Sequence, residues 1–166
     1  TIVISIEAIR HSDGTYEAYT DNGRERTGLD PYEWAIQAAE LGAGELLVTS
    51  INREGTGDGF DLELTRKIAQ SVPIPVIASG GCGNTIHISE VVTEGKADAV
   101  CLASILHYEF IKGNDQSGDF SSGGNTQFLE SRRGFSKVQD STLAEIKRHL
   151  HTQGISCRPA TQKSTN

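Results

Sequence analysis

The sequence lacks methionine altogether, contains one tryptophan, and has no apolar run that approaches the roughly 20 residues of a membrane-spanning helix. We therefore expect no transmembrane segment. Because no basic stretch is followed by an apolar stretch and a cleavage site, we also expect no signal peptide. Basic charge is scarce as well: 15 lysines and arginines oppose 22 acidic residues, so the net charge is −7. This balance argues against a general nucleic-acid-binding surface, although it leaves room for a local basic pocket.

Cysteine is sparse, and the positions of the cysteines argue against disulfide pairing. The three cysteines, Cys82, Cys101 and Cys157, are odd in number and far apart, and no two form a Cys-x-x-Cys pair. We therefore expect reduced thiols and a cytoplasmic location. The five histidines show no metal-ligand spacing, because His149 and His151 are two residues apart on an expected helix and point to different faces. No metal and no cofactor are expected.

What the sequence does contain is an alternation of short apolar segments with amphipathic ones. The apolar segments are rich in β-branched residues and predict strands at 1–8, 45–51, 73–79 and 98–105. Segments with capping residues predict helices at 30–41, 61–71, 85–95 and 141–154. The polar stretch 11–28 indicates turns or a hairpin at Asp13-Gly14 and Asn22-Gly23. The resulting βαβαβαβ order with near-continuous apolar strands is typical of a parallel sheet covered by helices.

An internal repeat favours a barrel over an open sheet. Residues 40–51 align with 94–105, and serines recur near the ends of the expected strands. These serines are Ser5, Ser50, Ser79 and Ser104. A repeating βα unit with polar groups at the same strand end is typical of a (β/α)8 barrel, whose active site lies at the carboxyl ends of the strands. The alternative is a doubly wound open sheet.

The number of strands predicts only half of such a barrel. A complete (β/α)8 barrel has about 250 residues, whereas this α/β chain has 166 residues and four expected strands. We therefore expect a C-terminal half-barrel of about four βα units, a single domain over 1–166 with a flexible insertion at 109–135 and a frayed tail at 159–166. Because a half-barrel leaves two sheet edges and one face open, it needs either a missing N-terminal half or a second copy of the chain.

The strongest site pattern is the turn SGGCGN at 79–84, which joins an expected strand to an expected helix. A glycine-rich turn exposes backbone N–H groups, and the start of the following helix adds positive potential, so this turn predicts a phosphate site. The segment LASI at 102–105, one strand further along, would add more N–H groups and the Ser104 hydroxyl. The alternative is that the glycines only allow close packing of helix on strand.

A second loop, TSINREGTGDGFD, also follows an expected strand end. It begins at Thr49 and contains Asn52 and Glu54, and its Gly55 and Thr56 indicate a further phosphate contact. The alternative for this loop is a solvated, charged surface.

Glu7 lies where the first expected strand ends. Its carboxylate would therefore face the mouth of a barrel, where an acid can relay protons to a bound substrate. The alternative is simple exposure to solvent.

Three long motifs resemble one known family. GAGELLVTSINREGTGDGFDLELTRKI, PVIASGGCGNTIHISEVV and ADAVCLASILHY are similar to the C-terminal half of HisF, the cyclase subunit of imidazole glycerol phosphate synthase. The resemblance implies a (β/α)8 barrel that joins ammonia, delivered by a HisH-like glutaminase, to a phosphorylated ribulosyl aminoimidazole carboxamide. The products would be imidazole glycerol phosphate and an aminoimidazole carboxamide ribotide. The family's phosphate contacts match Ser79, Gly80, Gly81, Ala103 and Ser104.

The chain departs from this family at catalytic positions. Glu7 and Glu54 stand where the family has aspartate, and Asn52 replaces a further aspartate. Each glutamate moves its carboxylate by one methylene, about 1.5 Å, and a shift of that size costs on the order of a hundredfold in rate. These departures and the 109–135 insertion resemble HisF-like paralogues that deliver ammonia for sugar amidation in surface polysaccharide synthesis. A third interpretation is a non-catalytic half-barrel that binds phosphate and dimerises.

Overall fold

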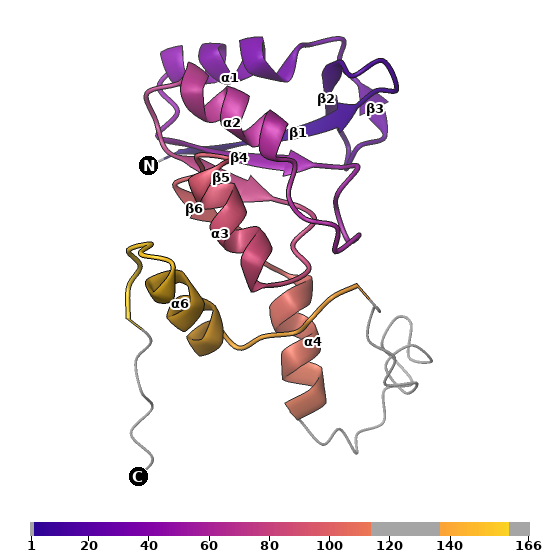
Figure 1. Cartoon of the computed structure of the whole chain (residues 1–166). Helices are drawn as coiled ribbons and strands as arrows, with labels where there is room; N and C mark the ends of the chain where they lie inside the picture. Colours follow the sequence, from indigo (N-terminus) through magenta and orange to yellow (C-terminus); the bar gives the residue numbers. More distant parts are fainter. Residues whose placement is uncertain (1, 114–136, 160–166) are drawn as a thin grey trace.

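The computed structural model describes residues 2–113 and 137–159, and its strands form a six-stranded sheet in the order β3-β2-β1-β4-β5-β6 (Figure 1). The strands are β1 (Val3–Arg10), β2 (Tyr16–Thr20), β3 (Glu25–Arg26), β4 (Glu45–Ser50), β5 (Val76–Ser79) and β6 (Ala99–Val100). The described helices are α1 (Pro31–Glu40), α2 (Leu62–Ser71), α3 (Thr85–Thr93), α4 (Ser104–Gly113) and α6 (Leu143–Thr152).

Four of the strands, β1, β4, β5 and β6, run parallel, as the sequence predicts. The register places Val48 of β4 between Ile6 of β1 and Ala78 of β5. Ala78 pairs in turn with Val100 of β6. Helix α2 connects β4 to β5, and α3 connects β5 to β6, so each forms a βαβ unit. The prediction of a partial (β/α)8 barrel is confirmed by this arrangement.

A hairpin extends the sheet beyond the parallel strands. Strand β2 pairs antiparallel with residues 7–10 of β1, and β3 pairs antiparallel with β2. The sequence indicated only turns or a hairpin here, and the turns are present: Gly14 has a φ of 86° and Asn22 a φ of 54°. Because β2 reaches only the second half of β1, it leaves the first half of that sheet edge without a partner strand among the described residues.

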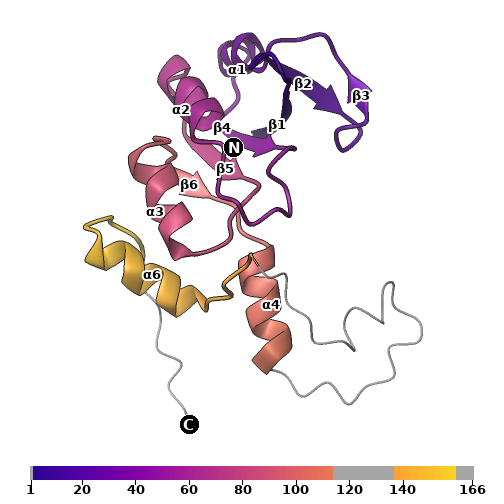
Figure 2. The ribbon, with the colours of Figure 1, turned by 45° about the vertical axis from the view of Figure 1, so that its right-hand side comes forward.

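Helices α1, α2 and α3 cover one face of this sheet (Figures 1 and 2). Both α1 and α2 begin at an aspartate, as predicted: Asp30 accepts a hydrogen bond from the Tyr32 amide at 2.7 Å, and Asp61 accepts one from the Leu64 amide at 3.0 Å. Alternate strand residues point to this face and form the main core with the helices. That core includes Ile6, Ala8, Leu46, Val48, Val76, Ala35, Leu64 and Ile68.

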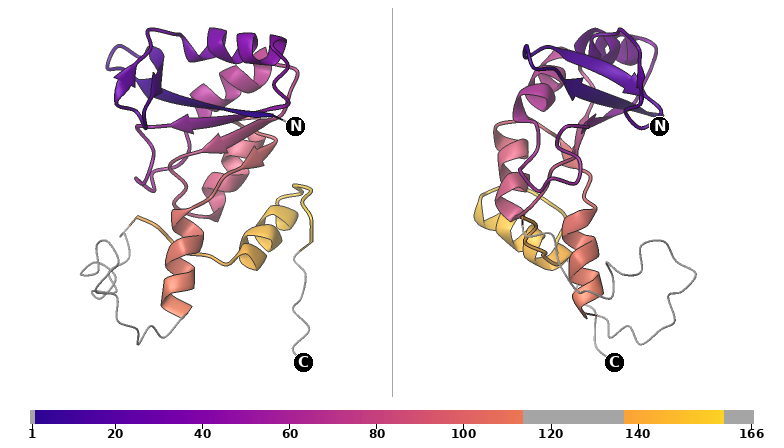
Figure 3. Two further views of the ribbon diagram at one scale, coloured as in Figure 1. Left: turned by 180° about the vertical axis from the view of Figure 1, so that it is seen from behind. Right: turned by 90° about the vertical axis from the view of Figure 1, so that its right-hand side faces the viewer.

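The opposite face of the parallel sheet is not covered by described helices (Figure 3). Its side chains are the intervening ones of each strand, and they retain solvent exposure: Val3 is 47% exposed, while Leu47 and Ile77 are half-buried. A parallel sheet normally has both faces buried. An uncovered, partly apolar face is therefore what half of a closed barrel leaves exposed.

The C-terminal part departs from the sequence-based expectation. The strand expected at 98–105 is wrong beyond Val100, because Ser104 already begins α4. Helix α4 leads away from the sheet and continues to Gly113, so the insertion expected at 109–135 begins with helical residues (Figure 3). Residues 114–135 of that insertion lie outside the described residues. Of the tail expected at 159–166, only Pro159 is described.

Helix α6 packs against α3. It begins with the predicted capping box, in which the Thr142 hydroxyl accepts from the Glu145 amide at 3.1 Å and the Glu145 carboxylate accepts from the Thr142 amide at 2.8 Å. Its Ile146 and Leu150 join a second core cluster with Ile88 of α3. The segment before α6 also reaches the glycine-rich turn, because the Gln139 amide donates to the Gly83 carbonyl at 2.7 Å.

Candidate functional site

The glycine-rich turn and the segment after β6 lie at the same edge of the sheet. Strands β5 and β6 are parallel neighbours, so their carboxyl ends meet at that edge. The Cys101 amide donates to the Ala78 carbonyl at 2.8 Å, which extends the pairing beyond β6. The structure thus places Ser79, Gly80 and Gly81 at the same edge of the sheet as Ala103 and Ser104, the five residues matched to phosphate contacts.

Close packing explains why the turn contains glycine. Gly80 and Gly81 have φ angles of 90° and 99°, in the left-handed region that L-residues rarely adopt. A Cβ on Gly81 would collide with the Gly59 carbonyl oxygen, and one on Gly83 would collide with the Gly57 carbonyl oxygen. The Gly59 amide also donates to the Gly81 carbonyl at 2.8 Å. The glycines therefore do allow close packing, as the alternative interpretation proposed. The packing partner, however, is the loop after β4 and not a helix.

Backbone donors nevertheless remain available at this edge. Within residues 2–113 and 137–159, no hydrogen bond is formed by the amides of Gly80, Gly81, Ala103 or Ser104. Ser104 opens α4, and the first amides of a helix have no partner inside that helix. The edge therefore offers donors from two adjacent segments to a bound acceptor.

The start of α3 offers fewer free N–H donors to an anion than the sequence predicts. The Asn84 side chain caps this helix, and its Oδ1 accepts from the Ile86 amide at 2.9 Å and from the His87 amide at 3.2 Å. The Gly83 amide donates to Nδ1 of His87 at 3.1 Å. Because these three amides are already bonded within the turn and the helix start, they are not available to a ligand.

Three polar side chains form a row across the uncovered face. Glu7 pairs with Thr49, and Thr49 pairs with Ser79, so the three residues are in register on β1, β4 and β5. The expectation that β1 ends at Glu7 is wrong, because β1 continues to Arg10, where β2 pairs with it. Oε2 of Glu7 is buried and has no hydrogen-bond partner among the described residues. A buried carboxylate oxygen without a donor is uncommon in folded proteins, and it can accept a proton or a hydrogen bond from a ligand.

The loop after β4 is held by its own polar residues. Oδ1 of Asn52 accepts from the Arg10 amide at 2.6 Å, and its Nδ2 donates to the Arg10 carbonyl at 3.2 Å. The Thr56 hydroxyl donates to the Arg53 carbonyl at 2.8 Å. These bonds tie the loop to the end of β1. Two residues of the loop take no part in these side-chain bonds. Gly55 faces open space, and the side chain of Glu54 extends toward Gly80.

A buried cluster that the sequence did not indicate lies beneath this loop. The Tyr16 hydroxyl on β2 donates to both carboxylate oxygens of Asp61, at 3.0 and 3.1 Å. Burial, and then the nearby Asp61 charge, raise the pKa of Tyr16 well above its ordinary value. Asp61 was predicted only as a helix cap, and the 45-residue separation from Tyr16 is why the pairing escaped prediction.

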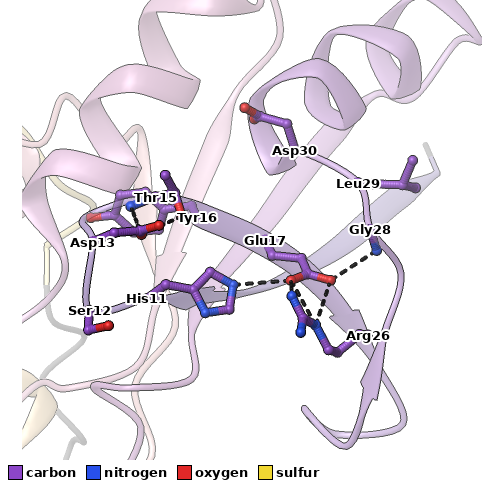
Figure 4. A pocket seen from close by; sticks show the side chains of 10 residues that line it. All are labelled: His11, Ser12, Asp13, Thr15, Tyr16, Glu17, Arg26, Gly28, Leu29 and Asp30. Carbon is purple, nitrogen blue, oxygen red and sulfur yellow. Dashed lines mark hydrogen bonds and ion pairs between the residues drawn. The ribbon is translucent and has the colours of Figure 1, made fainter.

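A polar pocket of about 580 Å³ lies between the hairpin and the start of α1 (Figure 4). At its centre, Glu17 accepts from Arg26 Nη2 at 2.6 Å and from the Gly28 amide at 3.0 Å, and it contacts His11 Nε2 at 3.1 Å. The Arg26 hydrogen bond is the main cause that lowers the pKa of Glu17 to about 2. The Arg26 guanidinium therefore neutralises the Glu17 charge, and the Gly28 bond ties β2 to the segment that precedes α1.

Neither a metal centre nor a membrane span is found in the described part of the chain. Residues 2–113 and 137–159 contain no group of three or more potential metal ligands, and none of their helices is long and apolar enough to cross a membrane. Burial raises the pKa of the Cys82 thiol to about 12, so this cysteine is not a reactive thiolate.

A parallel sheet with helices on one face, and with polar side chains in register at the carboxyl ends of its strands, defines part of a (β/α)8 barrel. The family described as "Histidine biosynthesis protein" matches residues 1–112, and the chain belongs to this family.

Two relatives are similar over the same region. The imidazole glycerol phosphate synthase subunit HisF of Alkaliphilus metalliredigens is 50% identical over 107 residues, which cover 64% of this chain and 42% of the relative. The subunit of the same name from Trichormus variabilis is 56% identical over 110 residues, which cover 64% of this chain and 43% of the relative. The chain thus spans less than half the length of the curated relatives it matches.

Proposed function

We propose that the chain is the C-terminal part of a HisF-like cyclase of histidine biosynthesis. In this reaction, ammonia joins a phosphorylated ribulosyl aminoimidazole carboxamide, and the products are imidazole glycerol phosphate and an aminoimidazole carboxamide ribotide. The proposal is supported by the family match and by the names of relatives at 50% and 56% identity. The single structural observation that supports it is the unpaired Glu7 oxygen in the polar row at the carboxyl edge of the sheet.

Each part of this edge has a role in the proposal. Glu7 transfers protons during ring closure, because it is an acid with an oxygen free to bond the substrate. The free amides at Gly80, Gly81, Ala103 and Ser104, with the Ser79 hydroxyl, hold one phosphate of the substrate. A second group of residues lies along the bound substrate: Thr49, which belongs to β4 rather than to the loop, and Asn52, Glu54, Gly55 and Thr56 of the loop after β4.

The proposed activity needs a second half-barrel and a glutaminase in addition to this chain. Four parallel strands with an uncovered face are completed either by an N-terminal half-barrel or by a second copy of the chain. A HisH-like glutaminase would supply the ammonia. We also propose a cytoplasmic location, where the three free cysteines remain reduced.

The test is a cyclase assay of the chain combined with the N-terminal half of the Trichormus relative, with ammonium chloride as the nitrogen source. We expect formation of imidazole glycerol phosphate, and a loss of at least about a hundredfold in kcat for Glu7→Gln, since general acid–base catalysis contributes about 10²–10⁴-fold. Glu40→Gln is the matched control, because Glu40 ends α1 at the opposite edge of the sheet. Equal rates for Glu7→Gln and the wild type would contradict the role of Glu7.

The departures at Glu7, Asn52 and Glu54 favour a second candidate, ammonia delivery for sugar amidation. The same assay separates the two: assembled protein that forms no imidazole glycerol phosphate, yet still activates a bound glutaminase, supports the delivery function. A third candidate, the phosphate-binding half-barrel that dimerises without catalysis, predicts a stable dimer of the chain alone in sedimentation equilibrium and no turnover in either setting.

A further inference from the structure

Glu54 lies against the glycine-rich turn at its first glycine. A Cβ built on Gly80 would stand 3.1 Å from Oε2 of Glu54 and 2.8 Å from the Ser50 carbonyl oxygen. Gly80 is one of the residues whose amide is free for an anion at the carboxyl edge. A carboxylate therefore occupies space beside the donors that the proposed function assigns to phosphate.

The backbone of the loop fixes Glu54 at this place. The Glu54 amide donates to the Ser50 carbonyl at 3.0 Å and to the Ile51 carbonyl at 3.2 Å. Two residues earlier, Asn52 bonds both backbone groups of Arg10. Because the turn is held on both sides, the direction in which the Glu54 side chain leaves the backbone is set by the fold.

The Glu54 charge is not neutralised nearby. Within residues 2–113 and 137–159, its carboxylate forms no hydrogen bond and no ion pair. The nearest basic neighbour in sequence, Arg53, donates to the Asp58 carbonyl at 3.3 Å. An unpaired carboxylate next to an anion site repels the anion, and this repulsion is screened by salt because Glu54 is exposed.

We propose that Glu54 is a specificity-determining residue that weakens phosphate binding at the glycine-rich turn, and that a bound phosphate displaces its carboxylate from Gly80. This inference rests on the proposed phosphate site. The length of the side chain is essential to it: an aspartate would end about 1.5 Å short of the position that the glutamate reaches. Removing the charge or shortening the side chain should therefore strengthen phosphate binding.

The experiment is a calorimetric titration of inorganic phosphate into the wild-type chain, Glu54→Gln, Glu54→Asp and the control Glu40→Gln, at pH 7 and low ionic strength. We expect Glu54→Gln to bind about five- to tenfold more tightly than the wild type, Glu54→Asp to fall between them, and Glu40→Gln to match the wild type. In 0.5 M sodium chloride, the difference should shrink to about twofold or less. Far-UV circular dichroism confirms that each variant is folded.

The outcomes separate this inference from the function on which it rests. Measurable binding that is equal in all four proteins overturns the role of Glu54 and leaves the phosphate site standing. Weaker binding by Glu54→Gln also overturns it, since the side chain would then hold phosphate rather than repel it. Absence of binding in all four proteins overturns the phosphate site and this inference together.

Discussion

The packing of the glycine-rich turn makes a quantitative prediction for Gly81→Ala. The substitution places a Cβ on a residue with a φ of 99°, which costs about 1–2 kcal/mol for an L-residue. It also forces the turn away from the Gly59 carbonyl, with a repacking cost of about 1–3 kcal/mol. Loss of the hydrogen bond between the Gly59 amide and the Gly81 carbonyl adds about 1 kcal/mol. We therefore expect the free energy of unfolding to fall by about 3–6 kcal/mol.

Gly42→Ala is the matched control for this prediction. Gly42 has a φ of 96°, almost the same as Gly81, but a Cβ there would have nothing within 4 Å. It should therefore cost only the backbone component, about 1–2 kcal/mol. Both variants can be measured by urea unfolding, followed by the fluorescence of Trp34, the single tryptophan, which packs against the main core. Equal losses of stability in the two variants would refute the argument that close approach to Gly59 requires glycine.

Two further predictions concern the hairpin and its anchors. Tyr16→Phe removes the hydrogen bonds to Asp61 and should lower the free energy of unfolding by about 1.5–3 kcal/mol. The control Ser50→Ala should cost less, because its contact with Asp61 is long at 3.5 Å; urea unfolding that ranks the two in the opposite order would contradict the assigned anchor. Glu17 has a pKa near 2 in the folded chain against an ordinary value of 4.5, so its contribution to stability is present above about pH 4.5 and is lost as the pH falls toward 2. Thermal unfolding between pH 2 and 6 should show a smaller pH dependence in Glu17→Gln than in the wild type, and identical profiles would rule out this role for Glu17.

Much of the fold could be predicted because its signals are local. Asp61 precedes a helical segment and caps it, and Thr142 with Glu145 forms a capping box within four consecutive residues. The apolar run that forms β4 and the one that forms β5 are each short and continuous, as expected for strands of a parallel sheet. Helix α4 was missed because the segment after β6 continues the apolar pattern of the strand without a turn residue before Ser104.

The candidate site was predictable only in part. The sequence located the glycine-rich turn and the strand ends, since a (β/α) repeat places polar residues at one edge. It did not indicate that Asn52 binds the backbone of Arg10, or that Glu54 reaches Gly80. Those contacts depend on the relative position of two loops that follow different strands, and no pattern within either loop specifies it.

The amino-acid sequence alone therefore determined which segments become strands and helices, that the strands are parallel, and that the chain is part of a barrel. These properties follow from the spacing of apolar and capping residues over ten or so positions. Only the tertiary structure shows three further features. They are the close contacts that require the glycines, the free amides of the turn and the unpaired oxygen of Glu7. Residues such as Gly59 and Gly81 are far apart in the sequence, and they pack and form a hydrogen bond only because the folded chain brings them together.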